Sequence, residues 1–145
     1  MKAVVQRVLN ANLKVEGELI SEISNGLVVF FGVGVGDTLE KANYLAGKIA
    51  KLRIFEDENG KMNKSVLDVC GEILCVSQFT LYADVSHGNR PSFTNAEAPE
   101  IASKTYDYFC EKLIENGVKV KRGIFGADMK ILQINDGPVT IVYEI

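Results

Sequence analysis

Gly26-Leu27-Val28-Val29-Phe30-Phe31-Gly32-Val33 is the stretch that decides the fold, because every position in residues 26–33 is apolar or glycine. A strand with one wet face alternates apolar with polar residues, whereas a strand covered on both faces does not. We therefore expect a central strand with both faces buried. The longest apolar run, residues 27–31, is far shorter than the ~18 residues of a membrane-spanning helix, so a membrane protein is excluded.

The segments on either side of this strand have different periods. Upstream, residues 3–8 and 11–15 alternate apolar with polar around a break at 16–18, which predicts an opening hairpin. Downstream, Asp37 is a candidate N-cap, and apolar residues then recur at helical spacing to about residue 52. The sequence therefore predicts β structure followed by a first amphipathic helix.

The rest of the chain repeats these two patterns. A second helix is expected to begin at Pro99 and to end at Asn116-Gly117. Further strands are expected at residues 53–55, 73–81, 118–121, 130–134 and 139–145. Most connections look too short for parallel crossovers, so we predict an α+β fold (α/β in a looser scheme). It would be one domain, residues 1–145, with a largely antiparallel, barrel-like sheet and two helices packed on it.

Composition excludes several classes of function. A net charge of −3 and a pI near 5.2 do not suit many phosphate contacts along a duplex, so we expect no DNA partner and only local contact with any RNA. A single histidine, His87, and no metal-binding motif predict neither a metal nor a cofactor. The N-terminus lacks the apolar stretch of a signal peptide, and the three cysteines form no framework. We expect a cytoplasmic protein with all three thiols reduced and in the core.

Two segments have polar residues where a strand would bury apolar ones. Ser77-Gln78-Phe79-Thr80 either satisfies its polar groups within the sheet or forms the wall of a polar pocket. The two hydroxyls, three residues apart, could reach one ligand only if the strand end bends. Asn135-Asp136-Gly137-Pro138 is either a hairpin turn or an element with a cis Gly-Pro bond. Both alternatives stay open on the residues alone.

Other segments give weaker indications. The polar segment 84–95 predicts an ordered loop or a mobile lid. Gly32-Val33-Gly34-Val35-Gly36 lacks the spacing of a dinucleotide-binding loop. A Ser-His-Asp triad of Ser77 or Thr80, His87 and Asp84 has the residue types but no nucleophile elbow. Residues 125–129 are either core or an apolar slot for a flat ring.

Several of these motifs together resemble the D-aminoacyl-tRNA deacylase family. They are Gln6-Arg7-Val8, Arg53-Ile54-Phe55, Gly60-Lys61-Met62-Asn63, Ser77-Gln78-Phe79-Thr80-Leu81, Arg90-Pro91-Ser92-Phe93, Phe125-Gly126-Ala127-Asp128-Met129 and Asn135-Asp136-Gly137-Pro138-Val139-Thr140. They occur in family order and spacing over the full length of the chain. The resemblance implies a homodimer, with active sites at its interface, that hydrolyses the ester between a D-amino acid and the 3′ end of tRNA.

The resemblance also implies residue roles. Ser77, Gln78, Phe79 and Thr80 would lie at the reaction centre. Gly137 and Pro138, braced by Arg7, would reach into the pocket of the partner subunit and select for chirality. Phe125 and Met129 would flank the terminal adenine. Such an enzyme would accept glycine, including glycyl-tRNA mischarged on tRNA-Ala, and would reject L-aminoacyl-tRNA.

The chemistry needs few side chains. An aminoacyl ester is already activated, so positioning, donors for the oxyanion and a water molecule suffice. We expect backbone N–H groups near Gln78 and Phe79 as donors, with help from the tRNA 2′-OH. The alternatives are a hydrolase that uses Thr80 as nucleophile and a dimeric, non-catalytic module that binds RNA ends.

Overall fold

The computed structural model describes all residues, 1–145, and places the long strand β1 at the centre of a six-stranded sheet. The order is β2-β1-β3-β6-β7, and β8 pairs with β1 as well. The strands are β1 (Lys2–Val15), β2 (Glu18–Ile23), β3 (Gly26–Gly32), β4 (Phe55–Glu56), β5 (Met62–Lys64), β6 (Glu72–Ser77), β7 (Lys119–Arg122) and β8 (Met129–Glu144). The helices are α1 (Leu39–Ala50), the 3₁₀ helix η1 (Phe79–Tyr82) and α2 (Pro99–Glu115).

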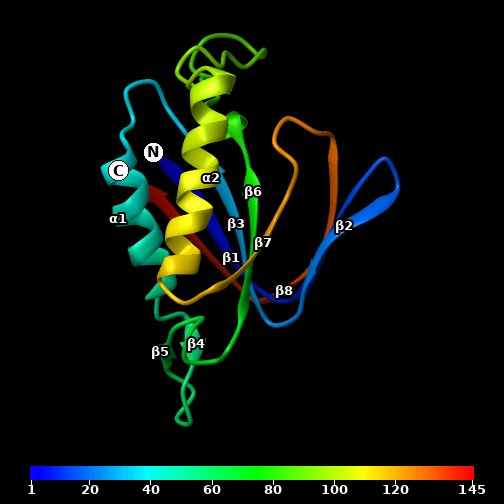
Figure 1. The fold of residues 1–145 in the computed structure, drawn as a ribbon, viewed down its shortest axis with the longest axis vertical. Coiled ribbons are helices and arrows are strands. Elements are labelled where there is room, and N and C mark those ends of the chain that lie inside the picture. The colour runs from blue at the N-terminus through cyan, green and yellow to red at the C-terminus, as the bar shows by residue number, and fades with distance from the viewer.

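The predicted fold class is confirmed, with one correction to the strand pairing. β1 pairs antiparallel with β2, β3 and β8, but β3–β6 and β6–β7 are parallel. The sheet is thus mixed, and each parallel pair is joined by a helical crossover, because α1 lies between β3 and β6, and α2 lies between β6 and β7. Parallel neighbours require such long connections. Both helices lie side by side against one face of the sheet (Figure 1).

β3 is covered on both faces, as its sequence predicts. On the helix side, Phe31 stacks on Phe109 of α2 with ring centroids 4.1 Å apart and an interplanar angle of 7°. On the other side, Val28 belongs to a smaller apolar cluster that includes Val8 and Leu74. A strand between two apolar layers has no wet face, which explains why residues 26–33 show no alternation.

The ends of the first helix differ from the prediction. The N-cap is Thr38, whose hydroxyl accepts from the Lys41 N–H, and the helix ends at Ala50 rather than residue 52. Asp37 instead binds the Met1 amino group at 2.7 Å. The strand expected at 53–55 is confined to Phe55–Glu56. Cys75 and Cys110 are buried, whereas Cys70 is exposed, so its assignment to the core was wrong.

Two further corrections concern the candidate functional segments. The strand expected at 73–81 ends at Ser77, and the chain turns into η1. Met129–Glu144 form one continuous strand, β8, so Asn135-Asp136-Gly137-Pro138 is not a hairpin turn. The Gly137-Pro138 bond is cis, the other alternative. Around it the β1–β8 register shifts, between Gln6 and Val8 and again between Val8 and Asn10.

None of the helices combines the length and the hydropathy that a membrane-spanning segment requires.

Candidate active site

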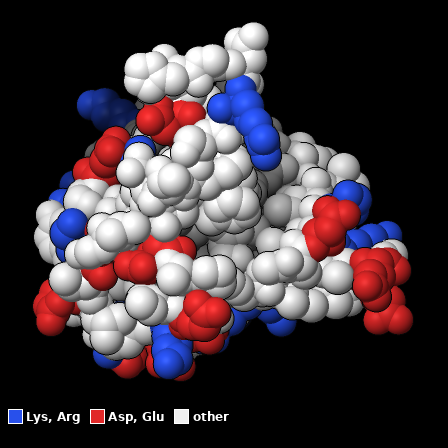
Figure 2. Space-filling model, turned by 90° about the horizontal axis from the view of Figure 1, so that it is seen from above, with Lys and Arg blue, Asp and Glu red and all other residues white.

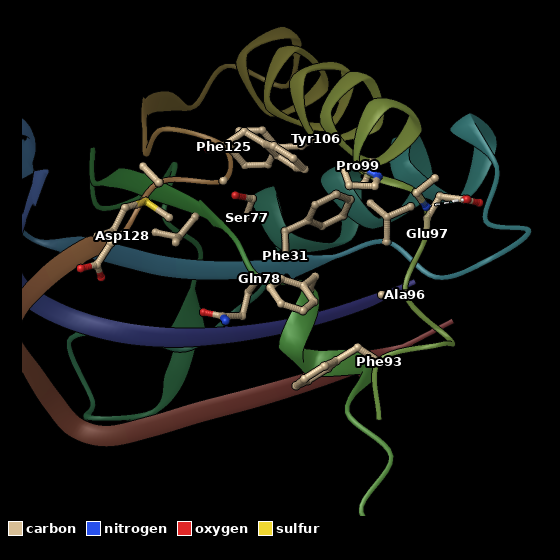
Figure 3. Close-up of a pocket in the computed structure, with 18 of the residues that line it drawn as sticks. Phe31, Ser77, Gln78, Phe93, Ala96, Glu97, Pro99, Tyr106, Phe125 and Asp128 are labelled. Atoms are coloured by element: carbon tan, nitrogen blue, oxygen red, sulfur yellow. Dashed lines mark hydrogen bonds between the residues drawn. The ribbon is translucent and has the colours of Figure 1, made fainter. Parts of the chain in front are cut away.

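A cavity of about 650 Å³ opens where β6 ends. Its walls come from four segments: the end of β6 with the start of η1, β3, residues 93–99 leading into α2, and the 125–129 turn before β8 (Figure 3). Thirteen of its nineteen lining residues are hydrophobic, which suits a flat or apolar group held by few polar contacts. Figure 2 shows a central hollow among uncharged side chains, with both signs of charge interspersed around it.

The chain bends at the end of β6, but the bend brings only the first of the two hydroxyls, that of Ser77, to the cavity. The Gln78 N–H donates to the Phe31 carbonyl at 2.8 Å, and Leu81 N–H donates to the Gln78 carbonyl at 3.3 Å. These bonds close the strand and begin η1, so Ser77, Gln78 and Phe79 line the cavity. The Gln78 N–H is therefore engaged, and expecting it as a free oxyanion donor was wrong.

Thr80 stands apart from the cavity lining. It is exposed, and its hydroxyl accepts a hydrogen bond from the Gln78 amide side chain. The four residues predicted for the reaction centre thus divide: three line the cavity, and Thr80 holds the side chain of one of them.

An aromatic wall surrounds the polar strand end. The rings of Phe79 and Phe93 meet edge to face with their centroids 5.1 Å apart. The ring centroids of Tyr106, on α2, and Phe125 are 6.3 Å apart. The Tyr106 hydroxyl donates to the Cys75 carbonyl at 2.8 Å. Burial raises the pKa of Tyr106 well above its usual value, so the phenol stays protonated. This hydrogen bond fixes α2 against β6 two residues before Ser77.

The 125–129 turn places both predicted ring-binding residues at the cavity. Phe125 and Met129 are half-buried, pack against the hydrophobic clusters and line the cavity, which is where an apolar slot for a ring would need them. The turn needs Gly126, whose φ is +75°. Asp128 also lines the cavity, and its exposed carboxylate pairs with Lys130 at 2.9 Å.

The three residues predicted for chiral selection lie outside this chain's own cavity. Arg7 is only 5% exposed; its Nη1 donates to the Ile54 carbonyl at 2.6 Å, and its Nε lies 3.0 Å from an Asp136 carboxylate oxygen. Gly137 and Pro138 are exposed. Arg7 thus holds the base of an exposed element that does not line this chain's own cavity.

Sequence reasoning missed several lining residues. Phe31 and Tyr106 look like ordinary core positions in the sequence, and only the packing of β3 against α2 brings them to the cavity. Phe93 belongs to the motif Arg90-Pro91-Ser92-Phe93, whose resemblance to the family was the one available signal. The triad is not assembled: Asp84 binds Ser86, and His87 is exposed. No group of three His, Cys, Asp or Glu side chains is placed to hold a metal ion.

Comparison with known proteins gives one consistent answer. The sequence matches the family described as D-Tyr-tRNA(Tyr) deacylase over residues 4–144. It is 54% identical over 144 residues to the D-aminoacyl-tRNA deacylase of Limosilactobacillus reuteri (strain DSM 20016), covering 99% of both chains. It is 51% identical to that of Thermosipho africanus (strain TCF52B), covering 99% of this chain and 97% of the relative.

Solved structures agree with the fold. One described as a c-Myc DNA unwinding element binding protein has a TM-score of 0.93 at 47% identity, covering 100% of this chain and 99% of the other. A probable eukaryotic D-amino acid tRNA deacylase has a TM-score of 0.82 at 20% identity, covering 99% and 98%, and shows the fold alone. On the family match and the two close relatives, the chain belongs to the D-Tyr-tRNA(Tyr) deacylase family.

Proposed function

We propose that this chain hydrolyses the ester bond of D-aminoacyl-tRNA in the cytoplasm and releases a free D-amino acid and tRNA. Membership of the family supports the reaction. The observation that carries it is the bent end of β6, which brings Ser77 and Phe79 into a mainly apolar, aromatic cavity. Aromatic side chains hold a terminal base by stacking, worth ~1–3 kcal/mol, without an extended basic groove. An acidic chain can therefore bind the 3′ acceptor end.

The proposed mechanism is assisted by the substrate. The ester carbonyl accepts from the Phe79 N–H, because the Gln78 N–H is bonded to Phe31. Ser77 orients the aminoacyl group, and the Gln78 side chain is held by Thr80. Water attacks the carbonyl, with the neighbouring ribose 2′-OH placing it or taking its proton. The tRNA ribose oxygen leaves and takes up a proton, so no covalent protein intermediate forms.

We propose that D-aminoacyl esters are selected over L-aminoacyl esters at an interface between two subunits. Gly137 and Pro138 are exposed in this chain and do not line its own cavity, so a second copy would supply them to the site. D- and L-esters carry the same functional groups, so only a steric block can separate them. Glycine has no side chain to block, so glycyl-tRNA, including that mischarged on tRNA-Ala, should pass the same filter.

We expect this chain to form a homodimer in solution. Leu132 and Val142 on β8 are 68% and 69% exposed, and Leu9 on β1 is 52% exposed. Exposed apolar side chains gathered on one pair of strands mark an interaction surface. Sedimentation at micromolar concentration should give twice the mass of one chain. A fully active monomer would overturn the proposal that the partner completes the site.

A single-turnover assay tests the reaction itself. D-Tyr-tRNA should be cleaved at least ~10³ times faster than L-Tyr-tRNA, which corresponds to a difference of about 4 kcal/mol in transition-state free energy. Quenched samples should contain no protein-bound acyl group. If both esters are bound and neither is cleaved, the chain is instead an RNA-end-binding module. Equal cleavage of both would refute chiral selection.

Thr80→Ala should leave substantial deacylation. Thr80 is exposed and holds the Gln78 side chain, so its loss should lower kcat by about tenfold or less, the scale of a lost orienting contact. The measurement is kcat on D-Tyr-tRNA, with Thr94→Ala in the neighbouring loop as a matched control. A loss of ~10⁴ or more, with an acyl group trapped on the wild-type protein, would make Thr80 the nucleophile.

A further inference from the structure

A buried carboxylate outside the cavity anchors two of its walls. Asp37 is 5% exposed at its side chain and binds the Met1 amino group, which is fully buried, at 2.7 Å. The same carboxylate accepts from the Gly34 N–H at 2.8 Å, from the Tyr82 hydroxyl at 3.0 Å and from Lys41 at 3.1 Å. Four donors from four parts of the chain thus meet on one side chain.

The Tyr82 contact fixes η1. Tyr82 is the last residue of this 3₁₀ helix, which begins with Phe79 two residues after β6 ends. Its ring lies directly on the 33–37 turn: a Cβ added to Gly34 would lie 2.4 Å from the ring. η1 is therefore attached at its first end to β3, through Gln78, and at its other end to Asp37.

The same turn also fixes the loop that carries Phe93. The Val35 N–H donates to the Asn95 carbonyl at 3.1 Å, and the Glu97 N–H donates to the Val33 carbonyl at 3.0 Å. Gly34, whose N–H is bound by Asp37, forms the β-bridge between them with Ala96. Phe79 and Phe93, which meet edge to face, thus lie on two segments that dock on one turn.

We propose that Asp37 is a positioning residue for the deacylation site, acting through Tyr82 on η1 and through Gly34 on the 93–97 loop. This rests on the proposed function. Asp37 touches no substrate; it sets the position of the Phe79 N–H and of the aromatic wall. A misplacement of about 1 Å at a reacting centre can cost ~10²-fold in rate. The loss of the tether, meaning the contacts from Asp37 to Tyr82 and to Gly34, should therefore be measurable in kcat.

The protonation states suit this role. Burial acts to raise the pKa of Asp37, but the hydrogen bonds from the Met1 amino group, Gly34, Lys41 and Tyr82 outweigh it, so the pKa lies below its usual value. The carboxylate is therefore anionic at neutral pH. Burial, followed by the nearby Asp37, raises the pKa of Tyr82, so its hydroxyl remains a donor.

Tyr82→Phe tests the tether with the loss of one oxygen atom. We expect kcat on D-Tyr-tRNA to fall about 5–10-fold with KM within about twofold, because the site is displaced rather than removed. Lys41→Met is the matched control: it removes another donor to the same carboxylate from the exposed side of α1. It should leave kcat unchanged. Both variants should melt within about 2 °C of each other.

Further measurements keep the two proposals separate. Asp37→Asn should reproduce the fall in kcat, and adding Tyr82→Phe to it should cause little further loss, since the two act as one unit. If Asp37→Asn does not fold, Tyr82→Phe decides alone. A Tyr82→Phe protein with the kcat of Lys41→Met overturns the inference. If the wild type cleaves no aminoacyl-tRNA, the proposed function fails. Hydrogen exchange then tests whether the Tyr82–Asp37 contact holds η1: the Leu81 and Ala83 amides must exchange faster in Tyr82→Phe than in Lys41→Met.

Discussion

Arg7→Met is expected to lower kcat/KM for D-Tyr-tRNA by ~10²-fold or more and the free energy of unfolding by about 2–3 kcal/mol. The guanidinium is 5% exposed and holds both the Ile54 carbonyl and the Asp136 carboxylate. Methionine fills much of the same volume but donates nothing, so the Ile54 carbonyl is left buried without its partner. The β8 segment that carries Gly137 and Pro138 also loses its charged anchor.

The activity should fall further than the loss of folded protein explains. Gly137 and Pro138 are proposed to enter the partner's site, so a shift at their base displaces the element that excludes L-side chains. L-Tyr-tRNA cleavage should accordingly fall less than D-Tyr-tRNA cleavage, and the D/L ratio should narrow. Single-turnover rates on both esters measure this, alongside urea unfolding.

Arg122→Met is the control for this experiment. Arg122 pairs with Asp107 at 3.4 Å, and both side chains are solvent-accessible, at 33% and 57%. An exposed pair of this kind contributes ~0–1 kcal/mol, so the variant should keep its stability and its D/L ratio. If the two arginine variants behave alike, Arg7 has no special part in chiral selection.

The sequence predicts elements whose periodicity is set by burial on one or two faces. Residues 26–33 follow that rule, and the second helix begins at Pro99 and ends before Asn116-Gly117 as predicted. The sequence alone could not show that β3 and β6 run parallel, because the direction of β6 depends on where the intervening helix returns the chain to the sheet. Nor could it show that β6 ends at Ser77, since the Gln78–Phe31 hydrogen bond that closes the strand joins residues 47 positions apart.

The candidate site divides in the same way. Ser77, Gln78 and Phe79 could be found because polar groups interrupt an apolar strand, a local signal. Asp37 was found but misassigned: an aspartate before a helix is the usual pattern of an N-cap, and only the folded chain brings the Met1 amino group to it. Tyr106 gave no signal at all, because a buried tyrosine on an amphipathic helix has the same spacing whether it faces a core or a cavity.

Gly26 is another residue whose role only the structure shows, and it gives the second large expected effect. In the sequence it opens an apolar strand and looks like any strand-flanking glycine. In the structure it faces Glu72 across the β3–β6 pair, and an added Cβ would lie 1.9 Å from the Glu72 carbonyl oxygen. That atom belongs to the backbone, so the clash can be relieved only by moving β3 and β6 apart, and β6 is the strand that ends at Ser77.

Gly26→Ala should therefore lower the free energy of unfolding by about 3 kcal/mol or more, at or beyond the upper range for overpacked cores. Gly47→Ala makes the same chemical change in α1, where the nearest atom to the added Cβ is 3.9 Å away. There it should raise the free energy of unfolding by about 0.5–1 kcal/mol, because alanine is the better helix former.

Urea unfolding of both variants measures the sign of each change in the free energy of unfolding. If the two variants change the free energy of unfolding in opposite directions, the loss in Gly26→Ala comes from the β3–β6 contact. Any folded Gly26→Ala protein should also lose deacylation, because its β6 is displaced at Ser77. A stable, fully active Gly26→Ala protein would show that β6 can shift without moving the site.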